Sequence, residues 1–152
     1  MLTVGLIGAG RIGRVHASTI VQDEGSQLVA VADSVDENAK NLAKLYKVNP
    51  RSVDAIFEDN SIEAILIASS TDTHSDFIEK ASIAGKAILC EKPVDLSLAR
   101  AKRCLENTKS NEHLIMMGFN RRFDPNFVAL KNALDGGEIG TAELLSITSF
   151  DP

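Results

Sequence analysis

The chain has 152 residues, of which 44% are hydrophobic and 24% charged, a composition ordinary for a globular domain. Its formal net charge of −5 offers no basic surface, so neither nucleic acid nor an acidic membrane is an expected partner. The apolar runs are strand-sized and predict no membrane span. Met1 leads directly into a strand without a basic and apolar leader, and the two cysteines lack metal-site spacing. These features predict a cytoplasmic protein with reduced thiols and no resident metal.

The first apolar segment, residues 3–7, runs into three glycines at the spacing Gly-x-Gly-x-x-Gly, and a helical segment follows. Gly8 permits a tight turn, Gly10 has no Cβ to hold the backbone away from a pyrophosphate, and Gly13 lets the helix pack closely on the strand. Free N–H groups at the start of that helix attract phosphate. The motif therefore predicts a dinucleotide-binding turn made of Gly8, Ala9, Gly10, Arg11, Ile12 and Gly13.

A second apolar strand, residues 27–32, ends at Asp33, which lies 20 residues beyond Gly13. A carboxylate at this place accepts hydrogen bonds from ribose hydroxyls and repels the 2′-phosphate of NADP. Neither Ser34 nor Val35 supplies a cation to offset that repulsion, so the pattern favours NAD as the cofactor. Two alternatives remain open: a helix cap by Asp33, which is compatible with that role, and a glycine-rich turn that holds no ligand.

Short strands and amphipathic helices continue to alternate up to residue 118. Helices are predicted over residues 36–48, 52–58, 75–84 and 97–109, and strands over residues 62–68, 87–90 and 113–118. Alternation of this kind predicts an α/β fold, a doubly wound parallel sheet with helices on both faces, so residues 1–118 are interpreted as a Rossmann-type dinucleotide-binding domain. Ligands of such sheets bind beyond the carboxyl ends of the strands.

The pattern changes after Gly118. A helix is predicted through about Leu134, closed by Gly136 and Gly137, followed by one long strand over residues 142–150. We interpret residues 119–152 as the first helix and strand of a truncated α+β second domain. Because that strand would present an unpaired, partly apolar edge, a homo-oligomer formed through it, or aggregation, is expected.

Polar residues follow the strand predicted over residues 62–68. Ser69, Ser70 and Thr71 form a turn that can pass along a cofactor or cap the next helix. His74 lies at the start of that helix, where the dipole disfavours imidazolium, so it is interpreted as structural or cofactor-adjacent rather than catalytic. His16 is expected to be a packed residue, and His113 begins a strand without a visible partner.

Glu91 and Lys92 follow the strand predicted over residues 87–90, at the sheet edge where a substrate oxygen would meet a nicotinamide. A lysine there can hydrogen-bond the reacting oxygen and stabilise its charge during hydride transfer. Burial that lowers its pKa would also let it assist proton transfer. The alternative for Lys92 is a solvated surface lysine. Glu91 is interpreted as a partner that binds ribose or orients Lys92, and Cys90 as a small buried side chain.

Four segments in this order resemble the glucose-fructose oxidoreductase and inositol dehydrogenase family of NAD(P)-dependent sugar oxidoreductases. They are the glycine motif, residues 68–74, residues 91–93 and residues 120–124. Within the family, Gly-Phe-Asn-Arg-Arg-Phe-Asp-Pro at residues 118–125 is similar to the myo-inositol 2-dehydrogenases. The resemblance covers essentially the whole chain but only the front half of a typical member. An Asp and a His four positions later, both catalytic in the family, belong to the other half.

The resemblance implies oxidation of a secondary hydroxyl on a cyclic polyol or sugar, with NAD as hydride acceptor and Lys92 as the catalytic residue on the reacting oxygen. It implies that residues 69–71 pass near the nicotinamide ribose and that Asn120 and Arg121 face the cofactor or substrate. The cofactor-binding set thus comprises Gly8, Ala9, Gly10, Arg11, Ile12, Gly13, Asp33, Ser69, Ser70, Thr71, His74, Glu91, Lys92, Asn120 and Arg121. Because the family's acid and base residues lie elsewhere, this chain is expected to bind cofactor but turn over poorly. A non-catalytic dinucleotide-binding module or subunit is the alternative.

Overall fold

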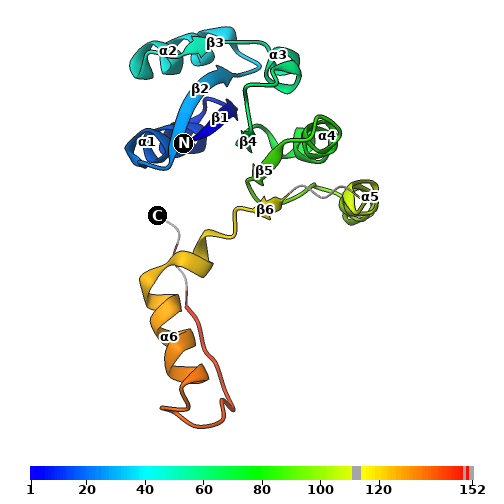
Figure 1. Cartoon of the computed structure of the whole chain (residues 1–152). Helices are drawn as coiled ribbons and strands as arrows, with labels where there is room; N and C mark the ends of the chain where they lie inside the picture. Colours follow the sequence, from blue (N-terminus) through cyan, green and yellow to red (C-terminus); the bar gives the residue numbers. More distant parts are fainter. Residues whose placement is uncertain (111–113, 149, 151–152) are drawn as a thin grey trace. The chain divides into compact units, whose positions relative to one another are not determined.

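The structure is a computed structural model that describes residues 1–110, 114–148 and 150, which form two compact units, residues 1–118 and 119–152. The first unit is a six-stranded parallel sheet in the order β3-β2-β1-β4-β5-β6 (Figure 1). Its strands are β1 Leu2–Ile7, β2 Ser26–Ala32, β3 Asn49–Pro50, β4 Ala64–Ile67, β5 Ala87–Cys90 and β6 Ile115–Met117. This architecture confirms the doubly wound α/β prediction. His113, expected to begin a strand, lies outside the described residues.

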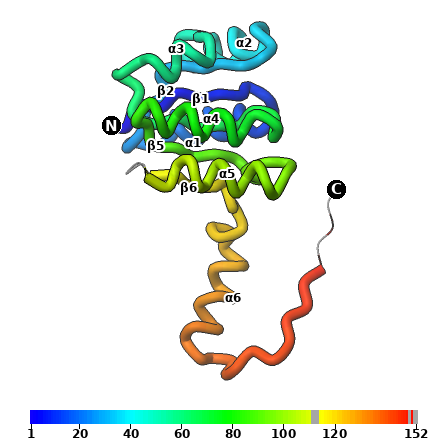
Figure 2. The backbone as a smooth tube through the Cα atoms, turned by 90° about the vertical axis from the view of Figure 1, so that its right-hand side faces the viewer, coloured from blue at the N-terminus to red at the C-terminus, as the bar shows by residue number. Residues whose placement is uncertain are grey.

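Helices cover both faces of the sheet. One face carries α1 (Arg11–Gln22) and α2 (Asp36–Tyr46), and the other carries α3 (Val53–Glu58), α4 (Thr71–Ile83) and α5 (Leu98–Thr108) (Figures 1 and 2). Each face has its own buried cluster, and successive strand residues alternate between the two. Leu6 and Leu66 pack on the α1 and α2 side, whereas Ile7 and Ile67 pack on the other. Because both faces are covered, the central strand β4 is apolar and buried at every position.

The start of one helix and the presence of one strand differ most from the sequence prediction, and most other boundaries lie within two residues of it. Helix α4 begins at Thr71, four residues before the predicted start, because Ser70 ends the preceding turn as N-cap and its carbonyl accepts hydrogen bonds from the N–H (3.0 Å) and hydroxyl (2.7 Å) of Thr73. The two-residue strand β3 was not predicted, since it forms only by pairing with Ala30 and Val31 of β2. Such a short segment has no apolar alternation for a sequence pattern to detect.

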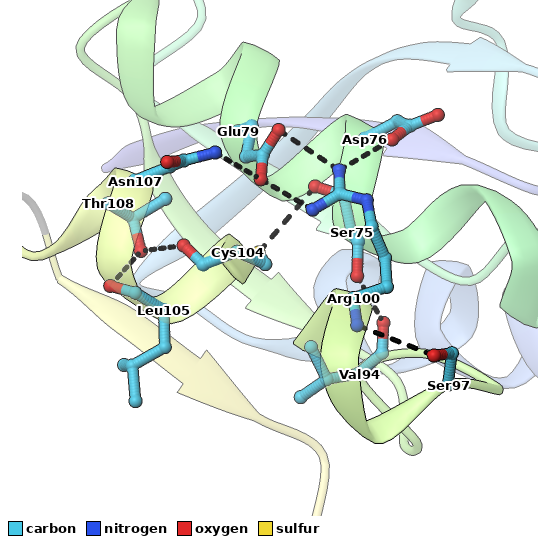
Figure 3. A network of polar contacts seen from close by, with 10 residues as sticks. All are labelled: Ser75, Asp76, Glu79, Val94, Ser97, Arg100, Cys104, Leu105, Asn107 and Thr108. Carbon is cyan, nitrogen blue, oxygen red and sulfur yellow. Dashed lines mark hydrogen bonds and ion pairs between the residues drawn. The ribbon is translucent and has the colours of Figure 1, made fainter. Parts of the chain in front are cut away.

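A polar network joins α4 to α5 (Figure 3). The Arg100 guanidinium on α5 donates to Glu79 (2.6 Å) and to Asp76 (2.6 Å) on α4, and Asn107 also donates to Glu79 (3.0 Å). These ion pairs raise the pKa of Arg100 further above its usual range. Bidentate contact with a partly buried carboxylate fixes α5 against its neighbour more firmly than a fully exposed pair would.

The second unit contains the short 3₁₀ helix η1 (Asn120–Phe123) and α6 (Pro125–Asp135). Asp124 caps α6 by accepting hydrogen bonds from the N–H groups of Asn126 (3.0 Å) and Phe127 (3.4 Å), and Pro125 occupies the first helical position.

The strand predicted over residues 142–150 is wrong for the described residues 142–148 and 150, which carry no strand. A strand is stable only with a hydrogen-bonded neighbour, and no described segment pairs with this one. Leu144 and Phe150 are both 90% exposed. Among the described residues, no helix is both long and apolar enough to cross a membrane.

Candidate functional site

The carboxyl ends of five parallel strands form one row at the edge of the first unit. Ile7 of β1 pairs with Ala32 of β2 on one side and with Ile67 of β4 on the other, and the row continues through Cys90 of β5 to Met117 of β6. The residues that follow these ends are Gly8, Asp33, Ala68, Glu91 and Gly118. The chain order reverses between β1 and β4, which is where open α/β sheets bind ligands.

A cavity of about 420 Å³ lies at this reversal point. Its volume is within the range of about 300–1,000 Å³ that is typical of small-molecule sites. Five of the predicted residues line it: Gly8, Gly10, Asp33, Ser69 and Ser70. The structure adds lining residues that were not among the predicted cofactor-binding residues: Ile7, Ser34, Val35, Asn38, Val53, Ala68, Thr73 and Phe77. Val53 and Phe77 lie on helices that no local motif connects to the glycine turn, so only the fold reveals them.

The glycine turn combines two packed glycines with one open position. Gly8 has φ +105°, and a Cβ added there would lie 2.3 Å from the carbonyl oxygen of Ala68. A Cβ added at Gly13 would lie 1.9 Å from the carbonyl oxygen of Gly8, so neither site accepts a side chain. At Gly10 an added Cβ meets nothing within 4 Å. Packing therefore does not demand glycine at position 10, and the space beside it is open to a ligand.

Helix α1 starts at the same place and points its N-terminus at this open space. Its N-cap is Gly10, no side chain caps it, and no acidic residue occupies its first turn. Unpaired N–H groups at a helix N-terminus, together with the positive end of the helix dipole, favour a phosphate group. Arg11 and Ile12 are exposed on this first turn, whereas Ala9 and Gly13 are buried beneath it. The residues present therefore fit the pyrophosphate of a dinucleotide.

Asp33 is tied to the glycine turn from the neighbouring strand end. Its Oδ2 accepts a hydrogen bond from the Ala9 N–H (2.6 Å), and its Oδ1 accepts one from the Val35 N–H (2.8 Å). The N-cap of α2 is Val35, so Asp33 is not the helix cap considered from the sequence. A carboxylate oxygen accepts about two hydrogen bonds, which leaves Oδ2 capacity for a ribose hydroxyl. Position and free capacity both fit a nucleoside ribose.

The turn after β5 presents Lys92 with an unoccupied ammonium group. Lys92 is exposed, so the burial considered for it is not found, and its ammonium group has no hydrogen bond or ion pair to any described residue. Glu91 is held instead by His16, whose Nε2 lies 2.8 Å from Glu91 Oε1. His16 is therefore more than a packed residue. This contact joins positions 75 apart in the sequence, and no local pattern signals it.

His74 links the turns after β4 and β5. It is 1% exposed, and its two ring nitrogens lie 2.7 Å from the carbonyl oxygen of Pro93 and 3.1 Å from that of Ser69. Ser69 is held further by its hydroxyl, 2.7 Å from that of Thr73. His74 thus has the structural role that was one of its two interpretations, and a direct cofactor contact stays a prediction.

Three other predicted residues have less defined surroundings. Thr71 is the first residue of α4 and is half-buried. Asn120 and Arg121 are exposed on η1 in the second unit, where Arg121 lies 3.4 Å from Asp124 and its guanidinium 5.6 Å from the centre of the Phe127 ring. Their roles toward a cofactor stay predictions.

Cys90 lies beside this site, but its thiol has no expected role in the chemistry there. It is fully buried, and burial raises the pKa of its thiol to about 12. The thiol therefore stays protonated near neutral pH and is a poor nucleophile. This confirms the interpretation of Cys90 as a small buried side chain.

A doubly wound sheet with an open glycine turn and an acidic residue after β2 defines the first unit as a dinucleotide-binding domain. The family model described as "Oxidoreductase family, NAD-binding Rossmann fold" matches residues 2–119. The chain belongs to this family, GFO/IDH/MocA, which confirms the resemblance found in the sequence.

Several named proteins and solved structures are similar to this chain. Inositol 2-dehydrogenase of Rhizobium meliloti (strain 1021) is 47% identical over 97% of this chain and 45% of its own length. A solved structure from Sinorhizobium meliloti 1021, named as a candidate myo-inositol dehydrogenase, superposes with a TM-score of 0.89 at 46% identity over 92% of this chain and 43% of that one. Scyllo-inositol dehydrogenase from Lactobacillus casei, solved with NAD(H) and scyllo-inositol, gives a TM-score of 0.86 at 28% identity, over 92% and 42%. The chain thus spans less than half the length of these relatives.

Proposed function

We propose that this chain binds NAD and forms the cofactor-binding part of a dehydrogenase that oxidises a secondary hydroxyl of a cyclic polyol or sugar. The observation that carries the proposal is the open space at Gly10, next to an uncapped helix N-terminus and the Asp33 carboxylate. The names of the relatives support inositol as the class of substrate, and one relative was solved with NAD(H). The domain assignment, residues 1–118 for the cofactor and the remainder as the start of a substrate domain, is part of the proposal.

The first unit supplies distinct groups for the pyrophosphate and for the adenosine half of the dinucleotide. The N–H groups of Arg11 and Ile12 would bind the pyrophosphate, and the cavity beside Asp33 would hold the adenosine half. The single carboxylate, with no cation at Ser34 or Val35, disfavours a 2′-phosphate and favours NAD over NADP. Ser69 would complete the wall of the site from the β4 side.

At the β5 end, Lys92 would donate a hydrogen bond to the substrate oxygen and stabilise the negative charge that develops there. NAD, when bound, supplies the hydride acceptor. The free ammonium group of Lys92 and its place in the row of strand ends support this role. Asn120 and Arg121 would contribute from the second unit, as the family resemblance implies.

A cofactor-binding module without turnover is the second candidate for the isolated chain. It is favoured by the surroundings of Lys92, because no described residue contacts its ammonium group to relay a proton. Efficient hydride transfer needs a proton acceptor and a closed site as well as a positioned lysine. Self-association is a further part of the proposal, as is a cytoplasmic location, which the two free thiols support.

Titration calorimetry with NAD and NADP tests the proposal. NAD should bind more tightly than NADP by about tenfold or more, since the 2′-phosphate would face a carboxylate. Gly10→Val fills the open space and should abolish NAD binding while circular dichroism stays unchanged. Gly25→Ala, in a turn outside this strand-end row, serves as the matched control. Asp33→Asn keeps one acceptor oxygen for the Ala9 N–H but removes the negative charge. It should therefore reduce the difference in affinity between NAD and NADP. Equal affinity for the two cofactors, or full binding by Gly10→Val, would contradict the proposal.

A further inference from the structure

The Glu91 carboxylate is held by groups from two directions. Its Oε1 lies 2.8 Å from His16 Nε2 on α1, and its Oε2 lies 3.3 Å from the backbone N–H of Lys92. An ionised carboxylate only accepts hydrogen bonds, so Nε2 of His16 carries the hydrogen. The side chains of His16 and Glu91 are 23% and 21% exposed, so the pair is largely shielded from water. The contact therefore has a defined geometry rather than that of a loose surface pair.

Gly118 forms the third side of this arrangement. It follows β6, and its N–H donates to the carbonyl oxygen of Cys90 (2.7 Å), which fixes it beside the β5 end. A Cβ added at Gly118 would lie 3.3 Å from the carboxyl carbon of Glu91 and 3.3 Å from both of its oxygens. Such an approach is tighter than ordinary van der Waals contact, so the carboxylate would have to move. The absence of a side chain at position 118 thus leaves the room that the Glu91 carboxylate occupies.

Glu91 is next to Lys92 in the chain, yet its carboxylate makes no ion pair with the Lys92 ammonium among the described residues. A carboxylate released from His16 could turn toward that ammonium, because opposite charges at short range attract. A lysine paired in this way would have at least one of its three hydrogen-bond donors engaged, and its positive charge offset, before any ligand arrived.

We propose that His16 is a positioning residue that holds Glu91 away from the Lys92 ammonium, and so keeps Lys92 free for the reacting end of the cofactor and substrate. Gly118 supports the arrangement by leaving space for the carboxylate. The inference rests on the proposed function, since it assigns the β5 end to the nicotinamide half.

The test compares two ligands on the chain as it is. NADH carries both halves of the dinucleotide, whereas ADP carries the adenosine and two phosphates but no nicotinamide half. His16→Met, which removes the donor, should weaken NADH about tenfold and leave ADP within about twofold, because one charge-assisted hydrogen bond is lost at one end only. His16→Gln, which keeps an N–H donor at similar reach, should restore NADH affinity to within about threefold.

A double-mutant cycle with Glu91→Gln separates the pair from independent effects. The double variant with His16→Met should bind NADH more tightly than His16→Met alone, because Glu91→Gln removes the negative charge that would otherwise pair with the Lys92 ammonium. Gly118→Ala should lower NADH affinity by itself. Gly25→Ala is its matched control, since a Cβ there also approaches a carboxylate, at 3.2 Å from Asp23, but outside the strand-end row.

The outcomes separate the two proposals. If neither NADH nor ADP binds the unmodified chain, the proposed function fails and the inference fails with it. If both bind but His16→Met weakens neither, or weakens both equally, the role of His16 at the nicotinamide end is wrong while cofactor binding stands. Additive losses in the cycle, or no rescue by His16→Gln, would also overturn the inference.

Discussion

The two units of this chain carry similar apolar residues but differ sharply in how they bury them. In the first unit Leu6 and Ile67 are fully buried, and each face of the sheet has a contiguous core. In the second unit none of the described residues of η1 or α6 is buried, and Leu144 is 90% exposed. Apolar composition therefore does not determine burial; neighbouring elements do.

Both units contain short-range interactions that favour helix formation. The second unit has a well-formed helix start at Asp124 and Pro125, and an ion pair between Lys131 and Asp135 one helical turn apart. Such contacts contribute about 0.3–1 kcal/mol each, which does not offset the entropy of ordering a segment without a core. The first unit adds parallel strand pairing and helices on two faces, which remove whole side chains from water. This difference predicts that the same substitution changes the free energy of unfolding more in the first unit than in the second.

The largest contrast is expected from the same truncation in each unit. Leu6→Ala removes a fully buried side chain and should lower the free energy of unfolding by about 2–5 kcal/mol. Leu144→Ala removes an exposed one and should change it by less than about 0.5 kcal/mol. Urea unfolding followed by circular dichroism measures both. Comparable losses would show that residues 119–150 share a core that the structure does not contain.

A second contrast uses two glycines that differ in surrounding space. At Gly13 a Cβ would lie 1.9 Å from the Gly8 carbonyl oxygen, so Gly13→Ala should cost about 1–3 kcal/mol through displaced backbone. At Gly136 the nearest atom is the Asn132 carbonyl oxygen at 3.1 Å, and Gly136→Ala should stay within about 1 kcal/mol of the unmodified chain. Thermal unfolding gives the comparison, and a neutral Gly13→Ala would refute the close packing of α1 on the turn.

A third contrast concerns ion pairs. Arg100→Met removes the ion pairs with two carboxylates that join α4 to α5 (Figure 3) and should cost about 1–2 kcal/mol. Lys131→Met removes one exposed pair within α6 and should cost about 0.3–0.5 kcal/mol. Raising the salt concentration should shrink the second effect more than the first. Equal costs would mean that the α4–α5 network adds no more than a surface pair.

The smallest effect is expected from acid. Hydrogen bonds from Ser61, together with Arg51, lower the pKa of Asp59 to about 2. A carboxyl group whose pKa is lower in the folded state adds stability above its unfolded pKa of about 3.8 and loses that addition as the pH falls toward 2. Asp59→Asn should therefore flatten the fall of stability between those pH values. Glu143→Gln in the second unit is the control, and an unchanged slope in Asp59→Asn would contradict the assignment.

Much of the first unit could be predicted because its signals are local. The glycine spacing and Asp33 after the second strand each follow from a few adjacent residues, and the alternation of strands with helices gives the parallel sheet. The contact between His16 and Glu91 could not be predicted, since the fold brings together residues 75 positions apart. The strand predicted over residues 142–150 is absent from the described residues 142–148 and 150 for a related reason. Its apolar pattern fits a sheet, but pairing requires a neighbour that local sequence does not specify.

The central claim is that the carboxyl edge of the first unit binds NAD. Amide chemical shifts of the ¹⁵N-labelled chain, followed while NAD is added, test it most directly. We expect the shifted amides to group at the glycine turn, at Asp33 and Val35, at Ser69 and Ser70, and at Glu91 and Lys92. Shifts confined to residues 119–150, or no shifts at millimolar NAD, would contradict it.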